Sequence, residues 1–135
     1  MTKPLLRRND LLYPELSYEI IGAAFDVYNE IGGGLLEKYY QKALAGYLAK
    51  RKVEFYQQVY CPIKYDGNVL GKKFLDFLVE EKIVVEIKKG TKFSKAHIDQ
   101  VLEYLKTNNM KLALLITFGH EGVMFKRVVN FSLPA

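Results

Sequence analysis

The sequence contains no tryptophan, one cysteine and only two histidines among its 135 residues. The single Cys61 excludes an intrachain disulfide framework and a cysteine-rich zinc site. No apolar run approaches the roughly 18–20 residues needed to span a membrane. The N-terminus carries Lys3, Arg7 and Arg8 but no apolar core of a signal peptide. We therefore expect a cytoplasmic protein that does not enter the membrane.

Acidic residues are in the minority, with 15 against 20 Lys and Arg, so the formal net charge is +5. This balance favours an anionic partner such as nucleic acid, although net charge alone does not define a site. Half of the residues are hydrophobic and 26% are charged, which is typical of a soluble protein with a real core. At this length we expect one domain over residues 1–135, with residues 1–15 as an N-terminal arm.

Two helices are predicted in the first part of the chain. Apolar residues recur at helical spacing over residues 17–31, with Ser17 as the N-cap, and Gly32-Gly33-Gly34 ends this helix. A second helix is expected over residues 35–52, with Glu37 in its first turn. A carboxylate there is stabilised by the helix N-terminus at about 0.3–1 kcal/mol, which is the structural interpretation of Glu37. The functional interpretation is an acid that points inward toward a site.

The rest of the chain predicts strands and one more helix. Strands are expected over residues 53–65, 69–79, 83–88, 112–118 and 123–131, and a helix with Ser94 as its N-cap over residues 95–108. The run 112–118 is apolar throughout, which is typical of a strand buried on both faces, and 123–131 alternates like an edge strand. A strand, a helix and a strand in succession form a βαβ crossover with two parallel strands. The fold class is therefore α/β (α+β), a mixed β-sheet flanked by helices in the order ααβββαββ.

Two acidic residues interrupt the hairpin formed by strands 69–79 and 83–88. If residues 80–82 form the turn, Asp76 falls opposite Glu86, and Lys88 lies on the same side of its strand as Glu86. Cross-strand partners have β-carbons about 4.5–5.5 Å apart, and like charges placed there repel. A divalent cation between the two carboxylates would turn that repulsion into a binding site. The alternative is a solvated face that carries a charge pair.

The predicted helix 95–108 adds a polar stripe, because His97, Gln100 and Tyr104 lie at i, i+3 and i+7. The crossover packs this helix on the meander, so that the stripe can face the acidic side of the hairpin. Mg²⁺ takes one or two protein carboxylates and keeps several waters, and a neighbouring lysine can stabilise charge on phosphorus. These parts describe metal-assisted phosphodiester hydrolysis. The structural interpretation is an ordinary helix flank, with His97 as a polar residue at the helix N-terminus.

These residues carry a resemblance to a known family. Asp76 followed by Glu86-Ile87-Lys88 resembles the D…(D/E)xK signature of the PD-(D/E)XK nuclease superfamily, and residues 100–104 resemble the QxxxY motif of its exonuclease-like branches. Residues 34–40, Gly-Leu-Leu-Glu-Lys-Tyr-Tyr, fit the pattern that names the GxxExxY family within it. Residues 113–119 and 126–130 also look like the C-terminal half of that family. The resemblance extends over roughly residues 16–131.

The resemblance implies a restriction-endonuclease-like core and a nuclease site that uses Mg²⁺ or Mn²⁺. By this resemblance, Glu37 would be a helical acid, Asp76 and Glu86 would bind the metal, and the backbone carbonyl of Ile87 would be a further metal ligand. Lys88 would be the catalytic lysine, and Gln100 and Tyr104 would be supporting residues on the helix. One departure concerns the position two residues before the aspartate, where the family commonly has a basic residue. Here that residue is Phe74, with Lys72 and Lys73 just before it.

Three functions are therefore weighed. The first is a Mg²⁺-dependent nuclease that acts on DNA or RNA. The second is a nucleic-acid-binding module with the same fold but no turnover, a hypothesis based on the basic charge and on Phe74. The third is a protein-interaction module, since eighteen aromatic residues and the aromatic-rich stretch 55–65 would suit a homodimer interface.

Overall fold

The computed structural model of the chain describes residues 12–90 and 92–132. Its elements follow the predicted order ααβββαββ: α1 (Pro14–Ile31), α2 (Glu37–Lys50), β1 (Phe55–Tyr65), β2 (Asn68–Val79), β3 (Ile83–Lys88), α3 (Lys95–Thr107), β4 (Leu112–Gly119) and β5 (Gly122–Val129). The strands form one sheet in the order β1-β2-β3-β4-β5. β3 and β4 pair in parallel and the other neighbours are antiparallel, so the predicted mixed sheet and its βαβ crossover are confirmed.

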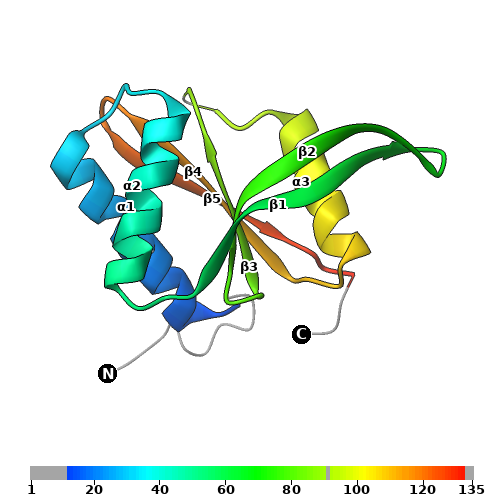
Figure 1. The fold of residues 1–135 in the computed structure, drawn as a ribbon, viewed down its shortest axis with the longest axis horizontal. Coiled ribbons are helices and arrows are strands. Elements are labelled where there is room, and N and C mark those ends of the chain that lie inside the picture. The colour runs from blue at the N-terminus through cyan, green and yellow to red at the C-terminus, as the bar shows by residue number, and fades with distance from the viewer. Residues whose placement is uncertain (1–11, 91, 133–135) are drawn as a thin grey trace.

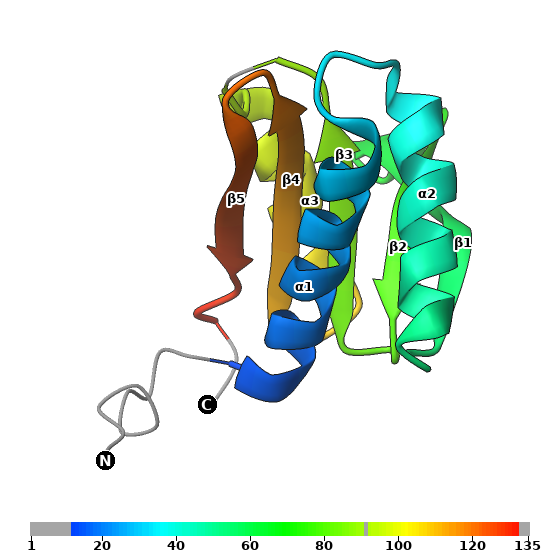
Figure 2. The same cartoon turned by 90° about the vertical axis from the view of Figure 1, so that its left-hand side faces the viewer.

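The helices cover the two faces of the sheet unequally (Figures 1 and 2). α1 and α2 pack on one face through a core that includes Ile20, Leu44 and Phe77. α3 packs on the other face over a smaller core that includes Leu75 and Val101. β4 lies between these cores with seven buried residues in succession, as its apolar run predicted. Within the described residues, no helix is both long and apolar enough to cross a membrane.

The predicted start of the first helix was wrong. α1 begins at Pro14, where the fixed φ of proline suits the first turn, and Tyr13 occupies the cap position. Ser17 therefore lies inside the helix, where it is buried against the sheet and its Oγ lies 3.5 Å from Nη1 of Arg127. Most of the expected N-terminal arm, residues 1–11, lies outside the described residues. The predicted N-cap of α3 is confirmed, since Ser94 Oγ accepts a hydrogen bond from the backbone N–H of His97.

The hairpin of β1 and β2 extends beyond the rest of the sheet. β1 and β2 contain 11 and 12 residues, whereas β3 contains 6 and is paired with β2 over only three residues. The outer part, residues 60–74, which we call the arm, projects to one side of the molecule (Figure 1). The sheet thus splits where the arm leaves β3, and this is the place where the sequence puts its two acids.

Candidate active site

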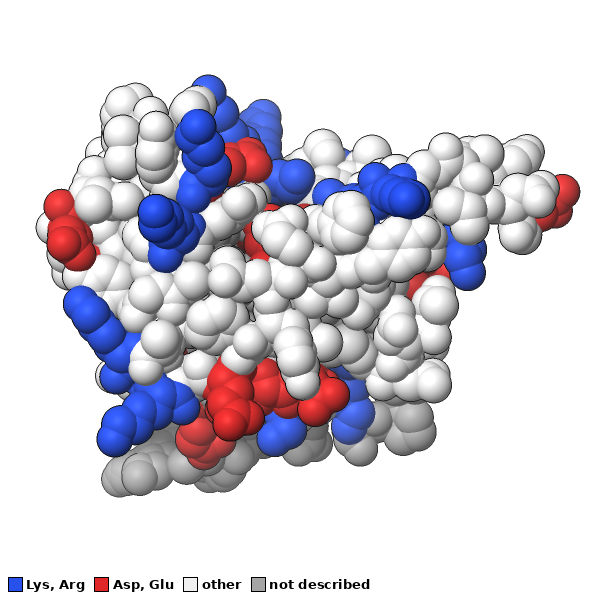
Figure 3. Space-filling model, in the orientation of Figure 1, with Lys and Arg blue, Asp and Glu red and all other residues white. Residues whose placement is uncertain are grey.

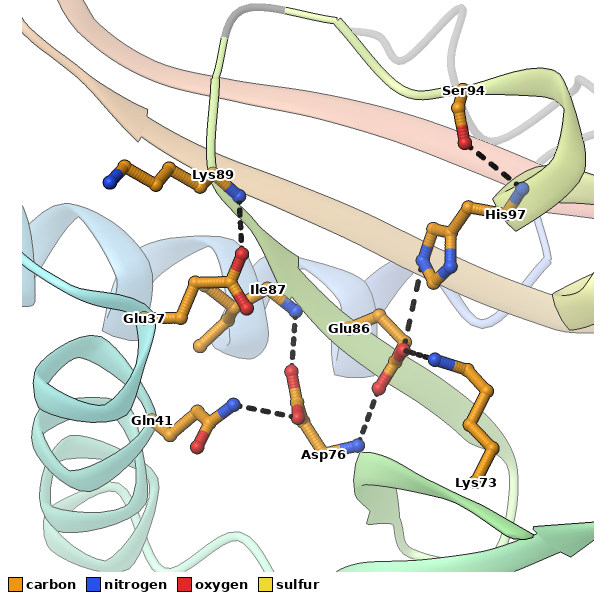
Figure 4. A network of polar contacts seen from close by, with 9 residues as sticks. All are labelled: Glu37, Gln41, Lys73, Asp76, Glu86, Ile87, Lys89, Ser94 and His97. Atoms are coloured by element: carbon orange, nitrogen blue, oxygen red, sulfur yellow. Dashed lines mark hydrogen bonds and ion pairs between the residues drawn. The ribbon is translucent and has the colours of Figure 1, made fainter. Parts of the chain in front are cut away.

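The site lies at the point where β2 and β3 separate. The predicted pairing of Val79 with Ile83 is confirmed, and the ladder ends at Phe77 and Val85. The next pair would be Asp76 and Glu86, and here side chains replace the backbone ladder. The backbone N–H of Asp76 donates to Oε2 of Glu86 at 2.5 Å, and that of Ile87 donates to Oδ2 of Asp76 at 2.7 Å (Figure 4). Each carboxylate thus occupies the place that a carbonyl of the opposite strand would take.

A local break in the alternation of side chains along β2, which we call the reversal, explains how Asp76 reaches this gap. Asp76 is also skipped in the ladder with β1, where its partner would be Gln58, a residue with a φ of 54°. Leu75 belongs to the core under α3 and Phe77 to the core under α1 and α2, although residues two apart in a regular strand share a face. The prediction that Asp76 and Glu86 share one face therefore needs correction. The two acids are neighbours, but Asp76 is contacted from α2 and Glu86 from α3.

Asp76 is a buried carboxyl with an unusually high pKa. Burial raises its pKa, the negative charge of Glu86 raises it further, and together they bring it to about 7. The hydrogen bond from Ile87 and the charge of Lys88 act in the opposite direction. On the α2 side, Nε2 of Gln41 donates to Oδ1 of Asp76 at 2.9 Å. The protein thus holds a carboxyl that is costly to ionise, which is common at functional sites.

Glu86 is even more buried, with 1% of the residue exposed. Burial raises its pKa, whereas the hydrogen bond from Asp76 and the charges of Lys73 and Lys88 lower it. Nζ of Lys73 lies 3.5 Å from Oε1 of Glu86, and Nε2 of His97 lies 3.6 Å from the same oxygen. Burial and the two lysines lower the pKa of His97 to about 4. The imidazole is therefore neutral at pH 7, and its Nε2 is a buried atom without a hydrogen-bond partner among the described residues.

The α1–α2 loop places Glu37 against the end of β3. Oε2 of Glu37 accepts a hydrogen bond from the backbone N–H of Lys89 at 2.7 Å. Tyr40 fixes the loop before it, because its hydroxyl donates to the carbonyl of Gly32 at 2.7 Å and accepts from the N–H of Leu35 at 3.1 Å. Its ring stacks on Phe118 with centroids 4.3 Å apart. Glu37 thus contacts the backbone directly after Lys88. It donates and accepts no hydrogen bond with either buried acid among the described residues, but its negative charge contributes to the raised pKa of Asp76.

The remaining predicted residues lie around this centre. Lys88 is half-buried at the end of β3, and no hydrogen bond or ion pair joins its side chain to another described residue. Gln100 and Tyr104 are on α3, where they line a hollow together with Lys73. Neither hydrogen-bonds to Asp76 or Glu86 within the described part of the chain. They are therefore adjacent to the acid pair through Lys73 and do not form part of it.

Three contacts of the acids were missed from the sequence: Gln41, Lys73 and His97. Gln41 lies four residues after Glu37 and thus on the same face of α2, which is a signal that could have identified it. His97 was predicted to share the polar stripe with Gln100, but its contact with Glu86 was not predicted, because a polar residue at the helix N-terminus was an equally simple interpretation. Lys73 gives no such signal, because the strand reversal that brings it to Glu86 has no mark in the sequence.

The donor atoms of this centre fit a hard divalent cation. The carboxylates of Asp76 and Glu86 and the carbonyl of Ile87 are oxygen ligands, which Mg²⁺ prefers, and Mg²⁺ needs only one or two carboxylates. The described residues contain no group of three or more His, Cys, Asp or Glu side chains that could hold a metal ion. The pair alone is therefore suited to a cation that keeps waters or shares substrate oxygens.

A comparison with known families agrees with the fold. The profile of the PD-(D/E)XK nuclease superfamily matches residues 14–128, and the chain belongs to this superfamily. No curated protein matches this sequence. A crystal structure of the protein SSO0001 is similar in fold, with a TM-score of 0.52 and 19% sequence identity over 68% of this chain and 49% of that one. The chain thus spans about half the length of that protein, and the likeness concerns the fold alone.

Proposed function

We propose that this protein is a divalent-metal-dependent nuclease that hydrolyses phosphodiester bonds of DNA or RNA. The observation that carries the proposal is the pair of buried carboxyls, Asp76 and Glu86, at the split between β2 and β3, with Lys88 next along β3. Membership of the PD-(D/E)XK nuclease superfamily supports nucleic acid as the substrate. Burying two carboxyls next to each other is costly unless an additional partner compensates for the charge.

The residues of the centre suit separate tasks. Asp76, Glu86 and the carbonyl of Ile87 would hold Mg²⁺ or Mn²⁺, which when bound polarises a phosphoryl oxygen and lowers the pKa of a water. Lys88, free of ion pairs with the described residues, would donate to the phosphoryl oxygens as negative charge develops on them. Glu37 holds the backbone N–H of Lys89 and thereby fixes the direction in which Lys88 leaves the strand. Gln100 and Tyr104 would contact the nucleic acid beside the centre.

The charges around the centre suit a phosphate backbone. Lys and Arg side chains gather over the N-terminal end of α2 and the base of the arm, on both sides of a small acidic spot (Figure 3). Cations in this arrangement attract a polyanion, and release of its counterions contributes to binding.

Cleavage assays with matched variants test the proposal. Labelled single- and double-stranded DNA and RNA are incubated with Mg²⁺ or Mn²⁺, with wild type and with Asp76→Asn, Glu86→Gln and Lys88→Met. We expect wild-type cleavage that needs the metal and at least a 100-fold loss in each variant. Glu81→Gln, in the exposed β2–β3 turn, is the control and should cleave normally.

Mg²⁺ should also raise the melting temperature of wild type and of Lys88→Met but not of the two carboxyl variants. Failure of wild type to cleave any of the four substrates would contradict the proposal.

A second candidate is a nucleic-acid-binding module without turnover. Phe74, which stands where the family commonly has a basic residue, is 46% exposed and packs against Tyr60 with ring centroids 5.7 Å apart. This function predicts salt-dependent binding that survives Lys88→Met. A metal-dependent cleavage that the same substitution abolishes would exclude it.

We infer in addition that the chain belongs to the GxxExxY family, on the basis of Gly34, Glu37 and Tyr40. The positive φ of Gly34 and the contacts of the other two residues give this motif one task, which is to place the start of α2 against the end of β3. A cytoplasmic location, a single domain over residues 1–135 and a homodimer also remain predictions. The apolar side chains exposed on the arm would suit a dimer interface, and sedimentation of a monomer at high concentration would contradict it.

A further inference from the structure

A hollow of about 190 Å³ lies between α3 and the base of the arm. We call it the α3 hollow; the residues of its wall used below are Cys61, Ile63, Lys64, Lys73, Gln100, Tyr104 and Thr107. Lys73 also lies 3.5 Å from Oε1 of Glu86. Lys73 therefore lies between the α3 hollow and Glu86, with its side chain bordering both.

The chemistry of this wall suits a flat ring with polar edges. Cys61, Ile63 and the partly buried ring of Tyr104 provide apolar surface. The amide of Gln100 makes no hydrogen bond with any other described residue, so its donor and acceptor are available at the rim. A nucleobase has two apolar faces and a hydrogen-bonding edge, and bases of single strands bind by stacking on aromatic side chains.

The α3 hollow is large enough for a single ring system only. Sites for drug-sized ligands measure about 300–1,000 Å³, and this hollow is smaller than that range. A base in a duplex is stacked on both faces and paired along its edge, so it must leave the helix before it can enter such a site. The ammonium groups of Lys64 and Lys73, both on the wall, would meet the phosphates that flank an inserted base.

We propose that the α3 hollow binds one unpaired nucleobase of the strand whose phosphate lies at Asp76 and Glu86, so that the substrate is single-stranded or locally unpaired nucleic acid. This inference rests on the proposed function, since it takes nucleic acid as the ligand of the neighbouring acid pair. It adds the part of the substrate that is recognised and the strandedness that follows from it.

Binding without metal tests the inference separately from cleavage. Fluorescence anisotropy in EDTA gives the Kd of full-length protein for a labelled mixed-sequence DNA 12-mer, for its RNA counterpart and for the fully paired duplex. We expect at least 10-fold tighter binding of a single strand than of the duplex. Equal or tighter binding of the duplex, or no binding of either form, would overturn the inference.

Two variants locate the effect in the α3 hollow. Thr107→Phe fills it from an exposed position on α3, and Tyr104→Leu removes the ring while keeping apolar volume. Each should weaken single-strand binding about 10-fold and leave duplex binding unchanged. The control is Tyr18→Leu, an exposed tyrosine of α1 on the opposite face of the sheet. Unchanged single-strand binding in Thr107→Phe, with its melting temperature preserved, would overturn the inference. A wild type that prefers single strands but never cleaves would instead contradict only the proposed function.

Discussion

The side chain of Asp76 is buried beside a second acid, Glu86, and its ionisation therefore lowers the free energy of unfolding by a measurable amount. Its pKa is 3.8 in the absence of these effects and about 7 in the folded protein. Between these pH values the unfolded chain has lost a proton that the folded protein keeps, so stability falls as the pH rises from about 4 to about 7. Since one pKa unit corresponds to about 1.4 kcal/mol, the cost above pH 7 is on the order of 4 kcal/mol.

We therefore predict that Asp76→Asn stabilises the metal-free protein at pH 8. The amide cannot ionise, and its oxygen can still accept the hydrogen bond from Ile87. The free energy of unfolding from urea titrations in EDTA should exceed that of wild type by a few kcal/mol at pH 8, and the difference should vanish near pH 4. Asp66→Asn, in the exposed turn of the arm, is the control and should show no such pH dependence. If the free energies of unfolding of Asp76→Asn and wild type differed by the same amount at every pH between 4 and 8, ionisation of Asp76 would not be the cause of the difference.

The residues around Asp76 show what the sequence could predict at this scale. The turn at 80–82 and the apolar patterns on both sides were sufficient to set the register that brings Asp76 to Glu86. The reversal at Gln58 and Asp76 was not predictable, because alternation assumes a regular strand and no glycine or proline marks the break. Lys73 and His97 converge on Glu86 only because of this three-dimensional arrangement.

At the scale of elements, the α1–α2 loop and the β4–β5 turn touch so closely that a side chain cannot fit between them. A β-carbon on Gly33 would lie 2.1 Å from the carbonyl oxygen of Gly119, which is a backbone atom that cannot rotate away. The hydroxyl of Tyr28 donates to the carbonyl of His120 at 2.9 Å and holds the same contact from α1. Because this loop leads into α2, the position of the loop also determines where α2 begins and thus where Glu37 lies.

We predict that Gly33→Ala destabilises the protein by about 1–3 kcal/mol, the usual cost of overpacking. The control is Gly46→Ala in the exposed interior of α2, where a β-carbon meets nothing within 4 Å. That change should instead stabilise the helix by roughly 0.5–1 kcal/mol. Thermal denaturation followed by circular dichroism measures both. Equal shifts of the two melting temperatures would show that the loop and the turn are not in contact.

Elements were more predictable than their ends. The periodicity of apolar residues identified the three helices and five strands found between residues 12 and 132, because burial on one face imposes that periodicity. The start of α1 was missed because Ser17 has the chemistry of a cap, while Tyr13 and Pro14 occupy the cap and the first turn. The last strand ends at Val129, two residues before the predicted end, since the side chain of Asn130 bonds to the carbonyl of Met110 and closes the strand.

At the scale of the whole molecule, the charge of +5 is distributed unevenly. In Figure 3, Lys and Arg side chains predominate at the upper end of the view, whereas at the lower end a group of acidic side chains lies among basic ones. Lys89 is exposed directly after β3, and its backbone N–H, not its ammonium, bonds to Glu37. Lys52 is exposed at the far end of α2, where it borders the same surface depression as Glu19 and Glu80. Under the proposed function we therefore expect the cations of the upper end to contribute most to binding, because Lys52 at the lower end is compensated by neighbouring acids.

This asymmetry predicts which lysine contributes to the salt dependence of binding. The logarithm of the association constant falls linearly with the logarithm of salt concentration, by about 0.7 per neutralised phosphate of a single strand. Lys89→Gln should reduce the measured slope by about this amount in EDTA, because it removes one cation and keeps the backbone hydrogen bond to Glu37. Lys52→Gln removes the same charge from the molecule and should leave the slope unchanged. If both variants reduced the slope equally, nucleic acid would respond to the net charge of the protein and not to the cations beside Asp76 and Glu86.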